Sequence, residues 1–251
     1  MEILAERKTK TVYKDENRTI KLFVDEYPKS NILNEALNQA RVEETGLNIP
    51  KLLEVSKIGS RWALISEYIQ GKSLETLMQE NPEKIDEYME LFINTQLEVL
   101  SKQAPLLNKL KDKMKRKIEE TDLSDAIKFE LNMRLESTPK HNRVCHGDFN
   151  PSNVIVTDDG KVYVIDWAHV TQGNSSADVA RTYLLFNLNG KKEEAEKYLN
   201  RFSEKSGIEK KYIQKWIPIV AAAHLSKASE EEKTFLMNWI DVAQCGATAM
   251  P

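Results

Sequence analysis

The alternation of apolar and polar residues predicts an antiparallel sheet at the start of the chain. Short apolar runs occur at residues 3–4, 11–13 and 19–23, and the last two flank a polar turn at residues 14–18. Residues 52–56 and 62–66 form a second pair of runs around a glycine-containing turn. Apolar runs of this length, bounded by turn residues, are typical of strands joined by hairpins.

The pattern changes to helical spacing between the two pairs and again after residue 73. Residues 31–44 predict a helix with Ser30 or Asn31 as its N-cap. Residues 73–138 predict two to four helices with breaks at Asn81-Pro82 and at residues 103–105. Within them, residues 109–120 are too polar for the core and predict an exposed helix or a mobile cap. Residues 191–239 are also expected to be helical.

Three oxygen-bearing side chains near two apolar runs are the strongest sign of chemistry. Asp148 and Asn153 lie five residues apart within residues 144–156, and Asp166 follows the next apolar run. The Asp-Asp-Gly turn at residues 158–160 predicts a hairpin between the two runs. We expect this arrangement to bring the three side chains together.

These residue types suit phosphoryl transfer. Mg²⁺ prefers oxygen ligands and is usually held by one or two protein groups together with substrate phosphates. The reaction also needs a carboxylate that orients the attacking hydroxyl and accepts its proton. Asp148 is therefore the predicted base, and Asn153 and Asp166 are the predicted metal ligands. The structural alternative is an ordinary turn with Asn153 and Asp166 at strand ends, but the three residues in this order favour catalysis.

Lys21 lies inside an apolar strand, where an unpaired ammonium group would be costly. Glu35, in the predicted helix, is an available partner, although the two could also be plain surface residues. No glycine precedes Gly46, so the turn at residues 7–10 cannot be a glycine-rich phosphate loop. Side chains of residues 8–11, two lysines and two threonines, are the candidate phosphate donors instead.

Composition excludes several classes of protein. The 251 residues are 30% charged and 41% hydrophobic, and no apolar run approaches the roughly 20 residues of a membrane span. Residues 1–7 lack the apolar segment of a signal peptide, which predicts a cytoplasmic protein. A net charge of −3 gives no general attraction to nucleic acid. Cys145 and Cys245 lack metal-ligand spacing, and we expect no disulfide.

Residues 144–167 resemble the catalytic loop and metal-binding strand of the aminoglycoside phosphotransferase and choline kinase family. Protein kinases, their larger relatives, use His-Arg-Asp, then Asn, then Asp-Phe-Gly. Here Gly147 replaces the arginine and Trp167 replaces the phenylalanine. Both differences favour the small-molecule branch over a protein kinase. The resemblance implies a protein-kinase-like two-lobed α+β fold, with a small antiparallel β-rich N-lobe of residues 1–68 and a larger, mainly helical C-lobe of residues 69–251.

The resemblance also implies ATP- and Mg²⁺-dependent transfer of the γ-phosphate to a hydroxyl of a small molecule. Lys21 and Glu35 match the strand lysine and helix glutamate that position ATP phosphates. Backbone groups of residues 67–69 (Glu67, Tyr68 and Ile69) would bind the adenine edge. Asp178 would brace the catalytic loop, or it would simply cap a helix.

Two questions stay open at the level of sequence. The acceptor could be an aminoglycoside, an amino alcohol or a sugar, and residues 245–251 are not the acidic element typical of antibiotic kinases. The glycine-free loop favours an alternative of another class, a kinase-like module that binds nucleotide with weak or no catalysis. The oligomeric state is likewise open.

Overall fold

The structure is a computed structural model that describes residues 1–240. Contacts divide the chain into two compact units. The first consists of Met1–Tyr88 and Pro151–Val170, and the second of Met89–Asn150 and the chain from Thr171 onward. The predictions about Cys245 and the C-terminal residues fall outside the described residues. The functional boundary predicted at residues 68 and 69 stays a prediction.

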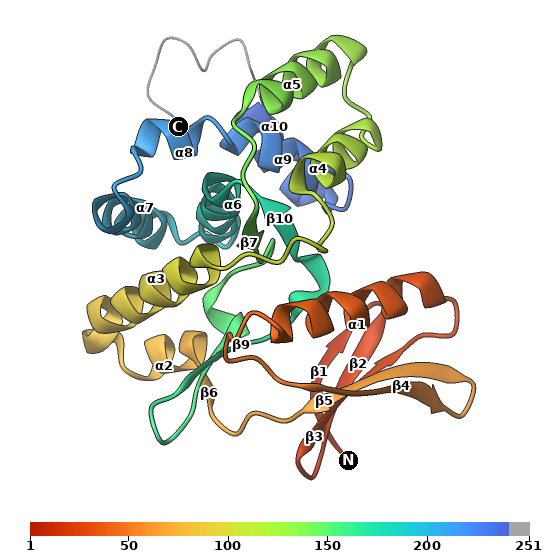
Figure 1. Cartoon of the computed structure of the whole chain (residues 1–251). Coiled ribbons are helices and arrows are strands. Elements are labelled where there is room, and N and C mark those ends of the chain that lie inside the picture. Colours follow the sequence, from red (N-terminus) through yellow and green to blue (C-terminus); the bar gives the residue numbers. More distant parts are fainter. Residues whose placement is uncertain (241–251) are drawn as a thin grey trace. The chain divides into compact units, whose positions relative to one another are not determined.

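A five-stranded antiparallel sheet forms the core of the first unit (Figure 1). Its spatial order is β1-β2-β3-β5-β4. The strands are β1 (Glu2–Arg7), β2 (Lys10–Asp15), β3 (Arg18–Phe23), β4 (Leu52–Ile58) and β5 (Arg61–Glu67). Both predicted strand pairs are therefore present, and the mixed α+β fold with an antiparallel N-terminal sheet is confirmed.

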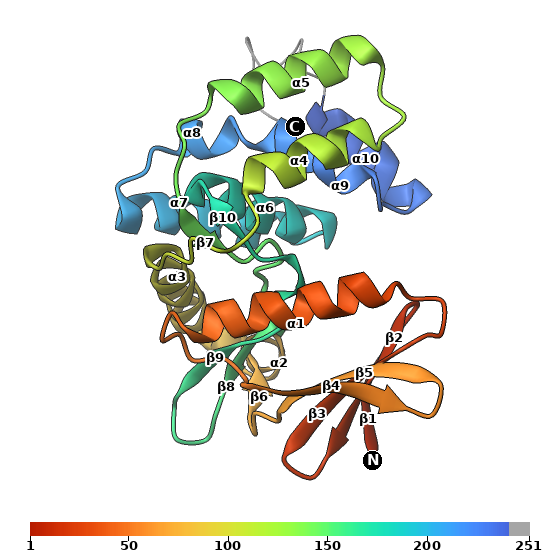
Figure 2. The ribbon, with the colours of Figure 1, turned by 45° about the vertical axis from the view of Figure 1, so that its right-hand side comes forward.

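The period of two along β3 decides where its residues point. Ile20 and Leu22 are buried on one face, together with Ala63 and Ile65 of β5. Lys21 pairs with Leu64 across the strands and shares the opposite face with it. That face is covered by α1 (Lys29–Glu43), as Figure 2 shows. Ile32 and Ala36 of this helix pack on Phe23 and Leu64. The sequence pattern thus directs Lys21 toward the helix.

The start of α1 corrects one prediction. Neither Ser30 nor Asn31 is the N-cap, because the helix begins at Lys29 and Pro28 occupies the cap position without a side-chain hydrogen bond. Pro28 has extended backbone angles, and proline readily precedes a helix because it donates no N–H.

A second, three-stranded sheet in the first unit carries the predicted hairpin. Its order is β6-β8-β9, and its members are β6 (Lys72–Ser73), β8 (Val154–Val156) and β9 (Val162–Val164). Gly71 lies so close to this sheet that a Cβ atom there would be 2.4 Å from the Val156 carbonyl oxygen. This close approach requires glycine at position 71. The short helix α2 (Leu74–Glu80) follows.

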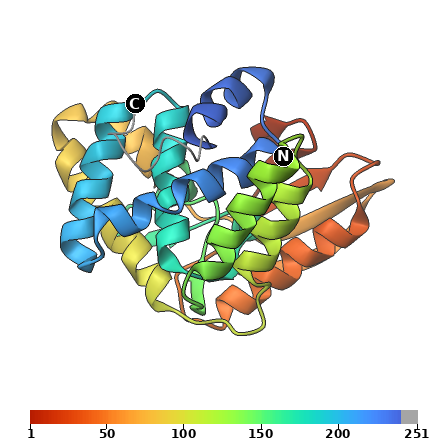
Figure 3. The same ribbon diagram turned by 90° about the horizontal axis from the view of Figure 1, so that it is seen from above.

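The second unit is mainly helical, with a two-stranded sheet of β7 (Arg143–Cys145) and β10 (Thr171–Gly173). Seen from above, the helices α4 and α5 lie side by side, in green in Figure 3. The helices are α3 (Ile85–Ser101, beginning in the first unit), α4 (Leu110–Glu119), α5 (Asp125–Ser137), α6 (Ser175–Leu188), α7 (Lys192–Ser206), α8 (Lys210–Gln214), α9 (Ile217–Leu225) and α10 (Glu230–Ile240). Over the described residues, no helix is both long and apolar enough to span a membrane.

The helix α4 departs from the expectation of a fully exposed or mobile segment. Leu110, Met114 and Ile118 are buried, and their spacing of four residues places them on one face. That face packs against α9. In the sequence, the many lysines between these three residues make the apolar pattern hard to see. The helix is packed into the second unit through this face.

Candidate active site

Lys21 of β3 joins two acidic side chains in the first unit. Its Nζ atom donates hydrogen bonds to Glu35 Oε1 at 2.6 Å and to Asp166 Oδ1 at 2.8 Å. The predicted contact between Lys21 and Glu35 is therefore present. Asp166 comes from a segment 145 residues further along the chain. One ammonium group thus holds the helix carboxylate and the predicted metal ligand together.

A second lysine, which the sequence did not single out from its neighbours, completes this cluster. Lys10, at the start of β2, has its Nζ atom 3.9 Å from Glu35 Oε1 and 3.8 Å from Asp166 Oδ1. Lys10 pairs with Phe23 in the sheet, two residues from Lys21, so both lysines lie on the face covered by α1. Two cations and two carboxylates therefore form a compact cluster, which we call the lysine cluster.

The electrostatics of the two lysines differ. Burial lowers the pKa of Lys21, but the adjacent Asp166 and Glu35 carboxylates outweigh it and raise the pKa above its usual range. Burial and the neighbouring Lys21 ammonium lower the pKa of Lys10. Lys21 is thus fixed in its charged form by two anions, whereas Lys10 is the more weakly held cation.

Asn153 lies next to Asp166 through the backbone of the hairpin. The Ile165 N–H donates to the Asn153 carbonyl at 2.9 Å, and Asn153 is 9% exposed. Asp166 has a left-handed backbone conformation with φ of 63°, which is uncommon for a residue other than glycine. Trp167 is buried and donates from Nε1 to the Val164 carbonyl at 2.9 Å. The tryptophan thus anchors the strained turn that directs Asp166 toward Lys21.

The predicted base, Asp148, belongs to a tightly braced loop of the second unit. Gly147 has a φ of 80°, which explains why a glycine precedes Asp148. The Asp148 N–H donates to the Nδ1 atom of the fully buried His146 at 3.2 Å. Asn150 donates to the Asp148 carbonyl at 3.0 Å. Phe149 is buried against Phe92 of α3, with ring centroids 4.7 Å apart.

Asp178 braces the same loop from α6. Its Oδ1 atom accepts a hydrogen bond from the Gly147 N–H at 2.6 Å, and Gln96 donates to Oδ2 at 3.3 Å. Burial raises the pKa of Asp178, and His146 and the Gly147 N–H oppose that rise. The helix is capped by Asn174, whose side chain accepts from the Ser176 N–H. The predicted bracing contact is present, and Asp178 is not the cap.

Removing the brace is expected to affect catalysis more than folding. In Asp178→Ala, the Gly147 N–H loses a charged acceptor, which is worth about 1.5–3 kcal/mol, and the adjacent Asp148 is no longer held in place. We expect turnover to fall by about ten-fold or more, with Asp178→Asn retaining more of it. The measurement is kcat together with the thermal unfolding midpoint of both variants. Equal kcat in wild type and Asp178→Ala would contradict the bracing role.

Arg181 is a residue of the second unit that sequence analysis missed. It lies one turn after Asp178 on α6, and its Nη2 atom is 3.8 Å from Asp148 Oδ1. The signal that could have found it is this spacing of three residues, which puts both side chains on one helix face. Arg181 gives Asp148 a cationic neighbour within the second unit.

His224 of α9 is a buried histidine whose pKa is lowered by its surroundings. Burial, with the charges of Arg181 and Lys227, lowers its pKa to about 3 from 6.5. Both ring nitrogens are buried without a hydrogen-bond partner among the described residues, and Glu232 Oε1 is 3.9 Å from Nε2. The histidine is therefore neutral in the folded protein at pH 7.

The pH dependence of stability follows from this shift. Below pH 6.5 the unfolded chain binds a proton at His224 that the folded chain does not bind, so stability falls as the pH drops from 6.5 toward 3. The contribution is about 1.4 kcal/mol per pH unit. We expect His224→Leu to lose this slope in urea unfolding, whereas His141→Leu, at an exposed histidine, keeps it. Parallel pH profiles for wild type and His224→Leu would contradict the assignment.

Two of the backbone N–H groups predicted to bind adenine already form hydrogen bonds within the first unit. The Glu67 N–H donates to the Lys51 carbonyl at 2.9 Å, and the Tyr68 N–H donates to the Asn17 carbonyl at 2.8 Å. The N–H groups of Glu67 and Tyr68 therefore have backbone partners, and the adenine-binding role of residues 67–69 stays a prediction.

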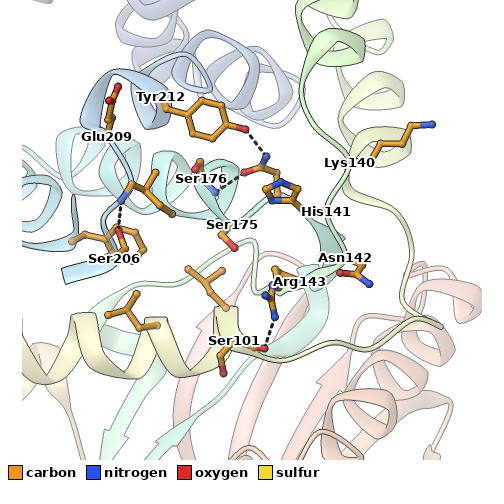
Figure 4. A pocket seen from close by; sticks show the side chains of 15 residues that line it. Ser101, Lys140, His141, Asn142, Arg143, Ser175, Ser176, Ser206, Glu209 and Tyr212 are labelled. Carbon is orange, nitrogen blue, oxygen red and sulfur yellow. Dashed lines mark hydrogen bonds between the residues drawn. The ribbon is translucent and has the colours of Figure 1, made fainter. Parts of the chain in front are cut away.

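A cavity of about 880 Å³ in the second unit contains none of the predicted site residues. Figure 4 shows Tyr212 and Ser176 on one side of it and Arg143 on the other. Asn174 links the first two, because its amide donates to the Tyr212 hydroxyl at 2.7 Å and its oxygen accepts from Ser176 N. The carboxylates of the predicted site lie outside this cavity. Among the described residues, no cluster of three or more His, Cys, Asp or Glu is placed to hold a metal.

The fold is that of the protein-kinase-like phosphotransferases. The structure aligns with aminoglycoside phosphotransferase APH(4)-Ia over 98% of this chain and 93% of that one, with a TM-score of 0.73 and 14% identity. A thermostable mutant of that enzyme, in a ternary complex with AMP-PNP and hygromycin B, aligns over 98% and 94% with a TM-score of 0.73 and 15% identity. LicA in complex with AMP aligns over 95% and 90%, with a TM-score of 0.61 and 15% identity. At these identities the similarity shows the fold alone.

The sequence itself identifies the family. Residues 10–210 match the model of the phosphotransferase enzyme family, and the chain belongs to that family. The predicted resemblance is thereby confirmed. No match was found among curated proteins.

Proposed function

We propose that the protein transfers the γ-phosphate of ATP to a hydroxyl group of a small molecule. The observation that carries the proposal is the contact of Lys21 with both Glu35 and Asp166. Kinases use a phosphate-binding lysine, held by a helix glutamate, together with a metal-binding aspartate. Membership of the phosphotransferase family supports the same reaction. In this proposal residues 1–68 are the nucleotide-binding lobe and residues 69–251 contain the catalytic loop and the acceptor site.

The residues fit a magnesium cofactor. Asn153 and Asp166 offer amide and carboxylate oxygens, the donors that Mg²⁺ prefers, and we assign the metal to them. When bound, the metal would neutralise phosphate charge. Lys21 would contact the phosphates, and Asp148 would orient the acceptor hydroxyl and accept its proton. The carbonyls of residues 67–69 and the N–H of Ile69 would bind the adenine edge.

Lys10 argues against the alternative of a catalytically inactive nucleotide-binding module. That alternative arises because no glycine-rich loop is available to cover the phosphates. The Lys10 ammonium, within 4 Å of the same carboxylates as Lys21, offers a side-chain cation in place of backbone donors. This favours an active enzyme over a binding module.

Two measurements on the full chain test the proposal. The first is a thermal-shift titration with ATP and MgCl₂, comparing wild type with Lys21→Met and with Lys84→Met, a matched change at an exposed lysine of the same unit. The second is ADP release with a panel of aminoglycosides, choline, homoserine and sugars. We expect stabilisation by ATP in wild type and Lys84→Met but not in Lys21→Met, and release of ADP with an acceptor. Stabilisation without turnover would favour the binding module, and no stabilisation would overturn the proposal.

A further inference from the structure

We propose that the acceptor is a small hydroxylated anion, and that Arg181, Lys113 and Lys227 bind its carboxylate or phosphate group beside Asp148. The inference rests on the proposed function and adds the chemical class of the acceptor. All four residues belong to the second unit. We call the three basic residues the cationic cluster.

Arg181 is the centre of the cluster. The residue is 9% exposed, and its Nη1 atom is buried without a hydrogen-bond partner among the described residues. On the other side of the guanidinium, Nη2 is 3.8 Å from Asp148, beyond hydrogen-bonding distance. A guanidinium offers five N–H donors in a planar fork that matches carboxylate and phosphate oxygens. A buried donor of this kind is costly to leave unsatisfied, and an anionic ligand would satisfy it.

Lys113 and Lys227 bring further positive charge to Arg181. Lys113 lies on α4, and Lys227 lies two residues after the end of α9, at the surface. The helix α4 packs against α9. Burial and the charges of Lys227, Arg116, Arg181 and Lys117 lower the pKa of Lys113 to about 8. Burial and Arg181 likewise lower the pKa of Lys227. The packing of α4 on α9 places these two lysines on neighbouring elements, and the lowered pKa values agree with that placement.

Nearby carboxylates offset only part of this charge. Asp148, Glu232 and Asp178 act on Arg181, although burial still lowers the pKa of its guanidinium group. Asp178 accepts hydrogen bonds from Gly147 and Gln96, and the outer cations Arg116 and Lys117 pair with Glu120. Asp148 and Glu232 are the acidic groups that act on Lys227. His224 adds no negative charge. Among the groups that interact here, the cations outnumber the carboxylates: Arg181, Lys113, Lys227, Arg116 and Lys117 against Asp148, Asp178, Glu232 and Glu120.

The positive charge of the cationic cluster favours an anionic acceptor over a cationic one. A polycationic sugar would meet like charges next to Asp148, which is a repulsive element against that class. An anion anchored on Arg181 would instead place a neighbouring hydroxyl of the same molecule close to Asp148. The cationic cluster is therefore suited to bind the non-reacting end of an acceptor whose other end is phosphorylated.

Anion binding is tested first with inorganic phosphate as the probe. Saturating AMP-PNP and MgCl₂ occupy the nucleotide site, and isothermal titration then measures the Kd for phosphate in the full chain. Lys113→Gln and Lys227→Gln are each expected to weaken binding by about ten-fold, as the loss of one charge-assisted hydrogen bond predicts. Lys115→Gln, the same change two residues along α4 at an exposed position, should leave the Kd unchanged. Equal Kd values in all variants, or no phosphate binding, would overturn the proposal.

Acceptor charge is tested second, on one three-carbon skeleton. Glycerate, glycerol and 3-amino-1,2-propanediol carry negative, no and positive charge at similar size. We expect kcat/KM for ADP release to be highest with glycerate and to fall about ten-fold with glycerate in Lys227→Gln, whereas Lys115→Gln keeps the wild-type value. Preference for the amine would overturn the inference and leave the proposed kinase activity intact. If AMP-PNP does not bind, the proposed function fails, and the phosphate titration without nucleotide still decides the anion site.

Discussion

Replacing Asp148 with asparagine is expected to lower kcat by a factor of about 10²–10⁴, because an amide cannot accept the proton of the attacking hydroxyl. Folding should be little affected, since the shorter hydrogen bonds of this residue use its backbone N–H and carbonyl groups, which bond to His146 and Asn150. Asparagine keeps the shape of the side chain that lies 3.8 Å from Arg181 and 3.5 Å from Asn150. AMP-PNP should still stabilise the variant in a thermal-shift titration. The measurement is ADP release with the best acceptor of the panel.

The matched control for this change is Asp158→Asn. Asp158 is exposed in the turn between β8 and β9, so the same loss of charge there should leave both kcat and stability unchanged. Turnover in Asp148→Asn within two-fold of wild type would remove Asp148 from the role of base. Loss of nucleotide binding together with turnover would instead indicate a misfolded variant, which the thermal unfolding midpoint would reveal.

Replacing Lys21 with methionine is expected to have the largest effect on stability. The side chains of Lys21 and Glu35 are 13% and 5% exposed, so the change leaves a buried carboxylate without its main partner. Breaking a buried ion pair in this way costs roughly 3–5 kcal/mol, and we expect the lower end of this range because Lys10 stays near both carboxylates. The free energy of unfolding in urea is the measurement.

The double variant Lys21→Met/Glu35→Gln sharpens this prediction. Removing the buried charge of Glu35 as well should recover part of the lost stability. The control Lys84→Met should leave the free energy of unfolding unchanged. The pKa of Lys21 is raised in the folded state, so its contribution is fully present below pH 10.5 and is lost only as the pH rises through the higher folded value. A Lys21→Met protein as stable as wild type, or a double variant less stable than the single one, would contradict the buried pairing.

The sequence predicted the parts of the site that follow from local periodicity. The apolar run at residues 19–23 placed Lys21 in a strand, and the helix predicted over residues 31–44 contained Glu35. The Asp-Asp-Gly turn predicted the hairpin that precedes Asp166. Asp178 was found because its partner, the catalytic loop, had already been identified by its own residues.

The contacts that the sequence did not predict join distant elements. Lys10 joins the lysine cluster only because the register of β2 and β3 puts it beside Lys21, and no local pattern encodes that register. Lys113 was hidden in a basic run taken for a solvated face, although Leu110, Met114 and Ile118 show which side of α4 is buried. The predicted N-cap of α1 was wrong because the helix begins at Lys29, with Pro28 in the cap position.

The most direct test of the central claim follows the γ-phosphate itself. The full chain is incubated with MgCl₂, ATP labelled with heavy oxygen in its γ-phosphoryl group, and each of the three size-matched acceptors, and the products are separated and analysed by mass spectrometry. We expect the label to appear as a phosphate ester on an acceptor hydroxyl with wild type and not with Asp148→Asn. Label that stays in ATP, or that appears only as inorganic phosphate, would contradict the assignment of the protein as a small-molecule kinase.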